Sequence, residues 1–351
     1  MSDNNSQNYK NYENTLPKVS VIIVNWNGGV LLHQCLKSVL TSNYPKDKLE
    51  VIVIDNASTD GSDEICQLEF PEIILIKNKE NLGFCEGNNI GITKSTGDIV
   101  ILLNNDCFVE PNWILEIVKV MERSDVGIVG CKLVYPHTGL IQSCGCNELF
   151  PGYWEHIASG LKIEEFNIED PFEVDYVPGA AMAIKRQVLK KVGLLDPIFW
   201  AYVEDVDFCY RARNAGFKIF LAPKAIAYHY GSTSWNRKPL KRFFLEYRNK
   251  FLFIYKNYRR KFLIEYLFKY LVRFTSISLI NFLHRNTSTQ RFVDRIIGNC
   301  GKTSTSFKIK ILLILIREYL YNAFFFIVSS FYCPYYIRTN KIHQKWKVEI
   351  R

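Results

Sequence analysis

The sequence predicts an α/β fold with a mostly parallel central sheet and helices on both faces. Three observations support this expectation. Four apolar runs in the first 103 residues lack polar alternation, which is typical of strands buried on both faces. Segments with helical spacing separate these runs, so consecutive strands require crossover connections. Polar side chains follow the runs, at the sheet edge where ligands of such folds bind.

The first two strands are expected at residues 18–24 and 50–54. Between them, apolar side chains recur at helical spacing over residues 31–40, which predicts an amphipathic helix. The first strand is followed by Asn25-Trp26-Asn27-Gly28-Gly29, and the second by Asp55, Asn56 and a loop rich in Ser, Thr and Asp.

The third and fourth strands are expected at residues 72–76 and 98–103. The fourth ends in Asn104-Asn105-Asp106-Cys107. Because parallel strands end at one edge of a sheet, Asn25, Asp55 and Asp106 are expected to lie together there. A hard oxygen ligand at this edge suits a divalent cation that holds a phosphate. The alternative is that Asn and Asp form an ordinary turn after the strand.

The glycine patterns argue against two other nucleotide-binding folds. A dinucleotide-binding fold needs Gly-x-Gly-x-x-Gly directly after its first strand, and Asn27-Gly28-Gly29-Val30 breaks this pattern. A P-loop needs a glycine-rich turn closed by Gly-Lys-Ser or Gly-Lys-Thr. Gly301-Lys302-Thr303 has neither the earlier glycine nor a preceding strand.

Several motifs in order resemble family 2 glycosyltransferases, and within them the rhamnosyltransferase-like branch. The resemblance runs from about residue 19 to about residue 249. Its motifs are Val24-Asn-Trp-Asn-Gly28, Asp55-Asn-Ala-Ser-Thr-Asp-Gly-Ser62, Asn81-Leu-Gly-Phe84 with Asn88-Asn89-Ile90-Gly91, Leu103-Asn-Asn-Asp106, Val177-Pro-Gly-Ala-Ala-Met182 and Phe199-Trp-Ala-Tyr-Val-Glu-Asp-Val-Asp-Phe-Cys-Tyr-Arg211.

The resemblance implies the nucleotide-diphospho-sugar transferase fold, in which a nucleotide-binding half and an acceptor-binding half share one sheet. It implies an inverting enzyme that moves a sugar, with rhamnose suggested by the branch, from a UDP- or dTDP-sugar. Asp55 would accept a hydrogen bond from the ring N–H of the base. The residues expected to bind the nucleotide sugar are Asn25, Trp26, Asp55, Asn56, Asn81, Gly83, Asn104, Asn105 and Gly179.

The resemblance also implies a metal site at Asp106, holding Mg²⁺ or Mn²⁺ against the donor diphosphate. The family usually has Asp-x-Asp here, whereas this chain has Asn104-Asn105-Asp106, so Asp106 is the one charged ligand. His229 ends a strand-like run over residues 218–228, and a histidine at this place joins the metal shell in related enzymes. Taken alone, a single histidine is more often a structural residue.

The pair Glu204-Asp205 is expected to carry the catalytic base. By its position in the motif, Asp205 would take the proton from the acceptor hydroxyl, and Glu204 would orient the acceptor or the loop. The alternative is a helix start, where acidic residues are favoured, and both can hold together. Asp207 is expected to pair with Arg211 one helical turn later. Aromatic neighbours suggest a cleft wall at this place: Phe199, Trp200, Tyr202 and Phe208.

Charge divides the chain into two parts. Residues 1–235 carry 20 basic and 30 acidic side chains, net −10, so the remaining 24 basic and 5 acidic ones give residues 236–351 a net +19. We expect a disordered polar tail over 1–16 and a catalytic domain over 17–235, with a nucleotide-binding half (17–110) and an acceptor half (111–235). Residues 236–351 are expected to form a basic, apolar helical region.

The composition of this last region favours an anionic membrane surface over nucleic acid, because its apolar content exceeds what a phosphate-binding patch requires. Within it, residues 311–337 are expected to form a shallow or re-entrant helix, with a true span as the alternative. The 10 cysteines include no Cys-x-x-Cys, so they are expected to be reduced and mostly buried.

The sequence therefore predicts a metal-dependent transferase at the cytoplasmic face of the cell membrane, peripheral or monotopic. Its acceptor would be a lipid-linked or growing cell-surface glycan. Two alternatives stay open: a nucleotidyltransferase, and a non-catalytic relative that binds a nucleotide or a glycan.

Overall fold

The computed structural model describes residues 15–150, 152–231 and 239–258. These residues belong to two compact units that meet in the chain at Arg242 and Phe243. The first unit holds every strand named below, and the second holds most of helix α8 (Pro239–Asn257). Within the described ranges, no helix combines the length and the apolar character needed to cross a membrane. The predictions for residues 1–14 and 259–351, including 311–337, lie outside these ranges.

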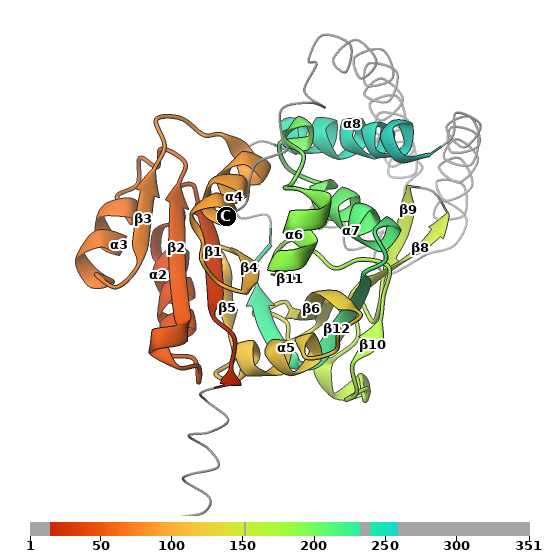
Figure 1. Ribbon diagram of the computed structural model, residues 1–351. Coiled ribbons are helices and arrows are strands. Elements are labelled where there is room, and N and C mark those ends of the chain that lie inside the picture. Colours follow the sequence, from red (N-terminus) through yellow and green to blue (C-terminus); the bar gives the residue numbers. More distant parts are fainter. Residues whose placement is uncertain (1–14, 151, 232–238, 259–351) are drawn as a thin grey trace, which may run out of the picture. The chain divides into compact units, whose positions relative to one another are not determined.

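Four parallel strands form the first half of the central sheet, in the spatial order β4-β1-β2-β3. Each corresponds to one of the four predicted apolar runs, with ends shifted by one or two residues (Figure 1). The fully buried side chains of β1 explain why that run has no polar alternation. The strands are β1 (Val19–Asn25), β2 (Leu49–Asp55), β3 (Ile74–Lys77) and β4 (Ile99–Asn104).

The same sheet continues into the second half of the domain through β11 (Ala181–Lys185), which is antiparallel to both β4 and β6 (Val126–Val134). Strand β12 (Lys218–His229) runs parallel to β6. Three short antiparallel strands complete it: β5 (Cys107–Val109), β7 (Ile141–Ser143) and β10 (Phe172–Glu173). Six of the ten strands (β1–β4, β6 and β12) point the same way, so the predicted mostly parallel sheet is confirmed.

Helices cover both faces of the sheet, as predicted. On one face, Val21 and Ile23 of β1 join a core with α2 (Gly29–Leu40) and α5 (Trp113–Met121). On the other face lies α4 (Gly83–Lys94), where a Cβ at Gly91 would come within 2.4 Å of the Ile22 side chain. The remaining helices of the sheet domain are α3 (Ser62–Glu69), α6 (Arg186–Val192), α7 (Glu204–Asn214) and the short 3₁₀ turns Lys46–Lys48, Ile163–Glu165 and Pro197–Phe199.

The ordered domain begins earlier than predicted. Leu16, which the sequence placed in the disordered tail, is buried, and its carbonyl accepts a hydrogen bond from Lys48 Nζ at 2.7 Å. The carbonyl of Pro17 accepts another from the hydroxyl of Tyr44. These anchors correct the boundary of the tail, because a single leucine among polar residues gave no periodic signal.

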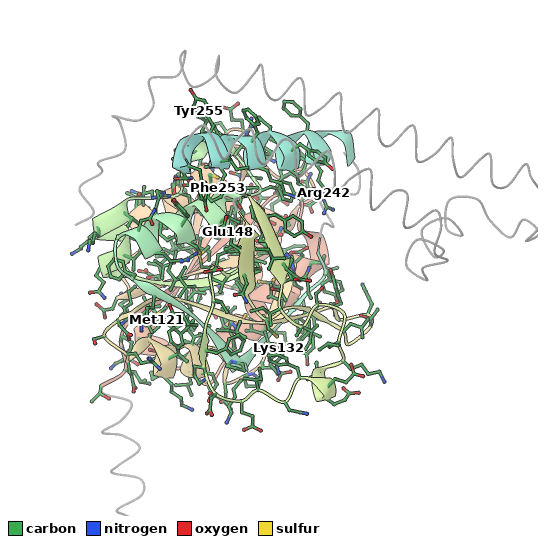
Figure 2. The ribbon with its side chains drawn as sticks, turned by 90° about the vertical axis from the view of Figure 1, so that its right-hand side faces the viewer. Met121, Lys132, Glu148, Arg242, Phe253 and Tyr255 are labelled. Atoms are coloured by element: carbon green, nitrogen blue, oxygen red, sulfur yellow. The ribbon has the colours of Figure 1, made fainter. Side chains whose placement is uncertain are left out.

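A small second sheet stands apart from the central one. It is the hairpin of β8 (Cys146–Phe150) and β9 (Tyr153–His156), with Glu148 on its first strand (Figure 2). Glu148 Oε1 accepts the backbone N–H of Gly152 in the connecting turn at 3.1 Å. The hairpin carries His156, which bears on the site described below. The eight cysteines in the described ranges are all free and buried, as expected.

Candidate active site

The ends of β1, β2 and β4 meet in a hydrogen-bonded cluster, as the sequence predicted. Asn25 and Asp55 are register partners at the ends of β1 and β2, and Asn25 Nδ2 donates to Asp55 Oδ1 at 2.9 Å. Asn105, which follows β4, donates from Nδ2 to Asn25 Oδ1, also at 2.9 Å. The three strand ends are therefore fixed relative to one another before any ligand is considered.

Asn25 is the centre of this cluster and is fully buried. Its Nδ2 also contacts the hydroxyls of Ser58 and Ser62, at 3.0 and 2.9 Å. A Cβ at Gly28 would lie 2.4 Å from Asn25 Oδ1, which explains the glycine at that position. Both polar atoms of the Asn25 amide thus make hydrogen bonds inside the protein, and these bonds hold Asp55 and Asn105 in place.

Asp55 is 2% exposed and accepts three hydrogen bonds. Oδ1 accepts from Asn25 Nδ2 and from Ser58 Oγ at 2.6 Å, and Oδ2 accepts from the Ser58 N–H at 3.0 Å. A carboxylate offers about four acceptor positions. One position on Oδ2 is left for a further donor, such as the ring N–H of a base.

Asn56, Asn81 and Gly83 join the loop before α4 to the end of β2. Asn56 Nδ2 donates to the Gly83 carbonyl at 3.0 Å, and Asn81 Oδ1 accepts the Gly83 N–H at 2.9 Å. Gly83 has φ +82°, and a Cβ there would lie 2.6 Å from the Trp200 ring. Because Trp200 belongs to the second half of the domain, this close packing connects the two halves. Asn56 and Gly83 are buried, whereas Asn81 and Trp26 are half-buried.

Asp106 and His229 form the one group of potential metal ligands found among the described residues, together with Cys107. Asp106 Oδ1 lies 3.3 Å from His229 Nε2, and both side chains are almost fully buried. Adjacent ligands on an octahedral Mg²⁺ are about 2.9 Å apart, given metal–oxygen distances near 2.05 Å. The observed separation is therefore close to that of two neighbouring ligands.

The hydrogen bonds of His229 also fit a cation. Gln142 Oε1 lies 2.8 Å from Nδ1, and Asn104 Nδ2 lies 3.2 Å from Nε2. An acceptor at Nδ1 and an amide donor at Nε2 are the partners of a ring that carries its proton on Nδ1 and a lone pair on Nε2. That lone pair faces the carboxylate of Asp106, an arrangement that a cation between them would stabilise. Burial raises the pKa of the Cys107 thiol well above its usual value, so Cys107 stays protonated and is a poor ligand for a hard metal.

Asp205 lies in the first turn of α7, as expected if Glu204-Asp205 begins a helix. Its carboxylate accepts hydrogen bonds from two backbone N–H groups. Gly179 donates to Oδ2 at 2.9 Å and Val206 to Oδ1 at 2.8 Å. Burial raises the pKa of Asp205 above its ordinary value, while these hydrogen bonds and the charge of His156 oppose the rise. The result is a half-buried carboxylate with acceptor capacity left, which is what a general base needs.

Glu204 differs sharply from its neighbour. It is 5% exposed, and its Oε2 has no hydrogen-bond partner within the described parts of the chain. Burial, followed by the charge of Asp205, raises the pKa of Glu204 well above its ordinary value. Glu204 therefore holds its proton more firmly than an ordinary glutamate, and Asp205 is the better candidate for the base of the pair.

The segment before α7 is strained. Trp200, Tyr202 and Val203 have φ of +64°, +72° and +70°, a region that costs of order 1–3 kcal/mol for such residues. The Trp200 carbonyl accepts the N–H groups of Phe84 and Cys85, at 2.8 and 3.1 Å, at the start of α4. This segment places Asp205 and anchors it to the half that carries Asp55.

Two further predictions near α7 have clear outcomes. Asp207 pairs with Arg211 at 2.8 Å, which confirms the expected helix-face contact, although Asp207 is fully buried. Phe199 and Phe208 are fully buried core residues, so the cleft-wall interpretation is wrong for them. Both rings pack in the core. The sequence alone does not distinguish a buried aromatic residue from one that lines a cleft. Trp200 and Tyr202 are half-buried.

Sequence reasoning missed two residues of this site, Gln142 and His156. Gln142 lies on β7 and contacts the ring of His229, and His156 lies on the β8–β9 hairpin close enough for its charge to act on Asp205. Neither follows a buried apolar run, so neither carried the signal that identified Asp55 and Asp106.

Comparison with known sequences agrees with the family resemblance of the motifs. Residues 20–193 match the family described as Glycosyl transferase family 2. The chain is 35% identical over 130 residues to "Glycosyltransferase AglE" of Haloferax volcanii, covering 36% of this chain and 43% of that protein. It is 26% identical over 264 residues to "Low-salt glycan biosynthesis hexosyltransferase Agl10" of the same organism, covering 69% and 79%. The chain spans less than half the length of AglE and of two other curated relatives that it matches.

Comparison with solved structures supports the fold. The mannosyltransferase PcManGT from Pyrobaculum calidifontis, in complex with GDP-Man and Mn²⁺, superposes with a TM-score of 0.55 at 17% identity. The similarity covers 92% of this chain and 88% of that one. At this identity the comparison shows the fold alone, which is the nucleotide-diphospho-sugar transferase fold expected from the motifs.

Proposed function

Residues 20–193 belong to glycosyl transferase family 2, and from this premise we propose that the chain is a metal-assisted, inverting glycosyltransferase. One observation carries the proposal. Asp106 and His229, which together could hold a cation, lie at the same sheet edge as the buried acceptor Asp55, and the ionisable carboxylate of Asp205 is tied to that edge through Trp200 and Gly83.

The donor in this proposal is a nucleotide-diphosphate sugar. Asp55 would accept the ring N–H of uracil or thymine at its remaining acceptor position, which favours a UDP- or dTDP-sugar. The half-buried side chains Asn81, Asn104 and Asn105 and the backbone of Gly179 would line the site, together with Trp26. Rhamnose is suggested by the sequence branch, and a hexose by the printed name of Agl10. Mannose enters as a candidate because PcManGT is described with GDP-Man.

Asp205 would act as the base. Its carboxylate would take the proton from an acceptor hydroxyl as that oxygen attacks the anomeric carbon, while the bond from this carbon to the diphosphate breaks. Asp106 and His229 would hold Mg²⁺ or Mn²⁺, which when bound neutralises charge on the leaving diphosphate. Glu204, which is buried and has a raised pKa, would keep the loop in place and would not exchange protons with the substrate.

The acceptor is proposed to be a lipid-linked or growing glycan at the cytoplasmic face of the cell membrane. The support is compositional: residues 236–351 carry a net +19 and long apolar stretches, which favour an anionic lipid surface over nucleic acid. Names of relatives that include glycan and O-antigen biosynthesis agree with a role in cell-envelope polysaccharides.

The two alternatives have less support. A nucleotidyltransferase needs a basic, glycine-rich loop after its first strand for a triphosphate, and Asn25-Trp26-Asn27-Gly28-Gly29 has no basic residue. A non-catalytic relative would have no need of the strained segment that presents Asp205, nor of the cation site at Asp106.

The test is a panel of nucleotide sugars incubated with the full-length protein and Mn²⁺. Slow hydrolysis is expected with one class of donor, and release of the nucleoside diphosphate measures it. The panel should include UDP-, dTDP- and GDP-sugars, each with and without EDTA. Release of pyrophosphate from nucleoside triphosphates, or binding without any turnover, would instead support one of the alternatives.

A further inference from the structure

We propose that Gln142 is a positioning residue that fixes the tautomer of His229, so that Nε2 faces Asp106 without a proton and can bind the cation. The inference rests on the proposed function for the identity of the cation, but the tautomer can be measured without any metal. Gln142 lies at the centre of β7 and is half-buried, with Oε1 2.8 Å from His229 Nδ1.

The contacts of the ring decide where the proton lies. A side-chain carbonyl oxygen can only accept, so Gln142 Oε1 requires a proton on Nδ1. A neutral imidazole has one N–H, which leaves Nε2 with its lone pair. Asn104 Nδ2, at 3.2 Å from Nε2, donates to that lone pair. The contacts with Gln142 and Asn104 thus favour a proton on Nδ1, whereas Asp106 Oδ1, an acceptor 3.3 Å from Nε2, favours the opposite tautomer. The Gln142 contact, at 2.8 Å, is the shortest of the three.

The opposite orientation of the Gln142 amide would reverse this result. Gln142 Nε2 would then donate to His229 Nδ1, and the ring proton would move to His229 Nε2. Asp106 Oδ1, 3.3 Å away, would accept that proton, and the pair would become a plain hydrogen bond with no lone pair for a metal. The orientation of the Gln142 amide therefore selects between a cation site and a closed His–Asp contact.

Gly231 lies beside the Gln142 amide and the His229 ring, at a positive φ that favours glycine. It has φ +73°, and a Cβ added there would lie 3.4 Å from Gln142 Nε2 and 3.9 Å from His229 Cε1. The chain thus turns directly over the amide and the ring, two residues after His229. Partners that orient a ligating histidine typically change metal affinity 10–100-fold when they are removed.

The first experiment measures the tautomer of His229 in the metal-free, full-length protein, by ¹⁵N NMR of histidine side chains. The His229→Gln variant identifies the signals. Wild type is expected to carry the proton on Nδ1. Gln142→Met, which removes the acceptor at similar length, should move it to Nε2, and Gln142→Glu, which can only accept, should return it to Nδ1. A wild-type ring protonated on Nε2 would overturn the inference, whether or not the protein binds a metal.

The second experiment measures Mn²⁺ affinity from the loss of the free-ion EPR signal. Gln142→Met should bind Mn²⁺ about 10–100-fold more weakly than wild type, and Gln142→Glu should restore the affinity. Gln67→Met, on the exposed surface of α3, is the matched control and should change nothing. Equal losses in the Met and Glu variants would show a packing role and refute the inference. If wild type binds no Mn²⁺ while its ring carries the proton on Nδ1, the cation part of the proposed function fails and the tautomer assignment stands.

Discussion

Replacement of Glu204 by Gln should change how the stability of the protein depends on pH. The folded protein buries this carboxyl without a hydrogen bond to Oε2, and burial raises its pKa well above the ordinary value of 4.5. Between the unfolded and the folded pKa, the native state therefore holds a proton that the unfolded state has released. Gln has nearly the same shape and no ionisation, so it removes this effect alone.

The sign and size follow from proton linkage. For an acid whose folded pKa is raised, the native state binds more protons, so its contribution to stability is fully present below pH 4.5 and decreases as pH rises toward the folded pKa. The slope in that window is about 1.4 kcal/mol per pH unit. For each pH unit inside that window, wild type should therefore lose up to about 1.4 kcal/mol relative to Glu204→Gln. In a domain of this size, that is a relative Tm change of about 3–6 °C per pH unit.

The assay is thermal unfolding of both proteins at half-unit steps from pH 4 to pH 8. The difference in Tm should stay constant near pH 4 and then increase with pH in favour of Glu204→Gln. Its value at any one pH also includes the cost of an unpaired amide, so the slope is the quantity that matters. The exposed Glu122→Gln variant should give no comparable slope. Parallel curves for wild type and Glu204→Gln would refute a buried, protonated Glu204.

Three further predictions concern the remaining parts of the proposed site and of the chain. Asp106→Ala should weaken nucleotide-sugar binding in Mn²⁺ and remove the response to added metal, and full activity of wild type in EDTA would contradict this role. Asp55→Ala should raise KM more than it lowers kcat, since a base contact is the same in the ground and transition states; unchanged nucleoside diphosphate affinity by calorimetry would argue against it. The full chain should sediment with anionic vesicles and be only partly released by high salt, whereas a well-folded truncation after Asn257 should bind weakly; equal binding would end the anchoring proposal.

The fold was predictable because its strands carry an unambiguous local signal. Most side chains of residues 19–25, 49–55 and 99–104 are buried, on both faces of the sheet, which leaves nearly continuous apolar runs. The antiparallel insertion of β11 between β4 and β6 was not predictable, because strand order depends on contacts between distant parts of the chain. Gly87 and Gly91 lie inside α4, where the sheet approaches too closely for a Cβ, and the sequence alone did not reveal this reason for them.

The site was predictable where a polar residue ends a buried strand, as at Asp55 and Asp106, or where a motif marks it, as at Asp205. Roles inside the cluster were not predictable, because they depend on burial. Asn25 was expected to bind the nucleotide sugar, and its hydrogen bonds to Asp55, Ser62 and Asn105 could not be read from the sequence. Gln142 and His229 are 87 residues apart in the sequence, and no local sequence pattern predicts a contact between them.

In the proposed mechanism, Asp205 removes the acceptor proton while the strand-end cluster binds the donor. The most direct test compares Asp205→Asn with wild type in two quantities, the affinity for the nucleotide sugar that wild type hydrolyses and the rate of nucleoside diphosphate release at saturation. We predict that the affinity stays within about twofold and that the rate falls by about 10²–10⁴-fold, because an amide cannot take the proton. A near-normal rate, or a loss of affinity as large as the loss of rate, would contradict the assignment of Asp205 as the base.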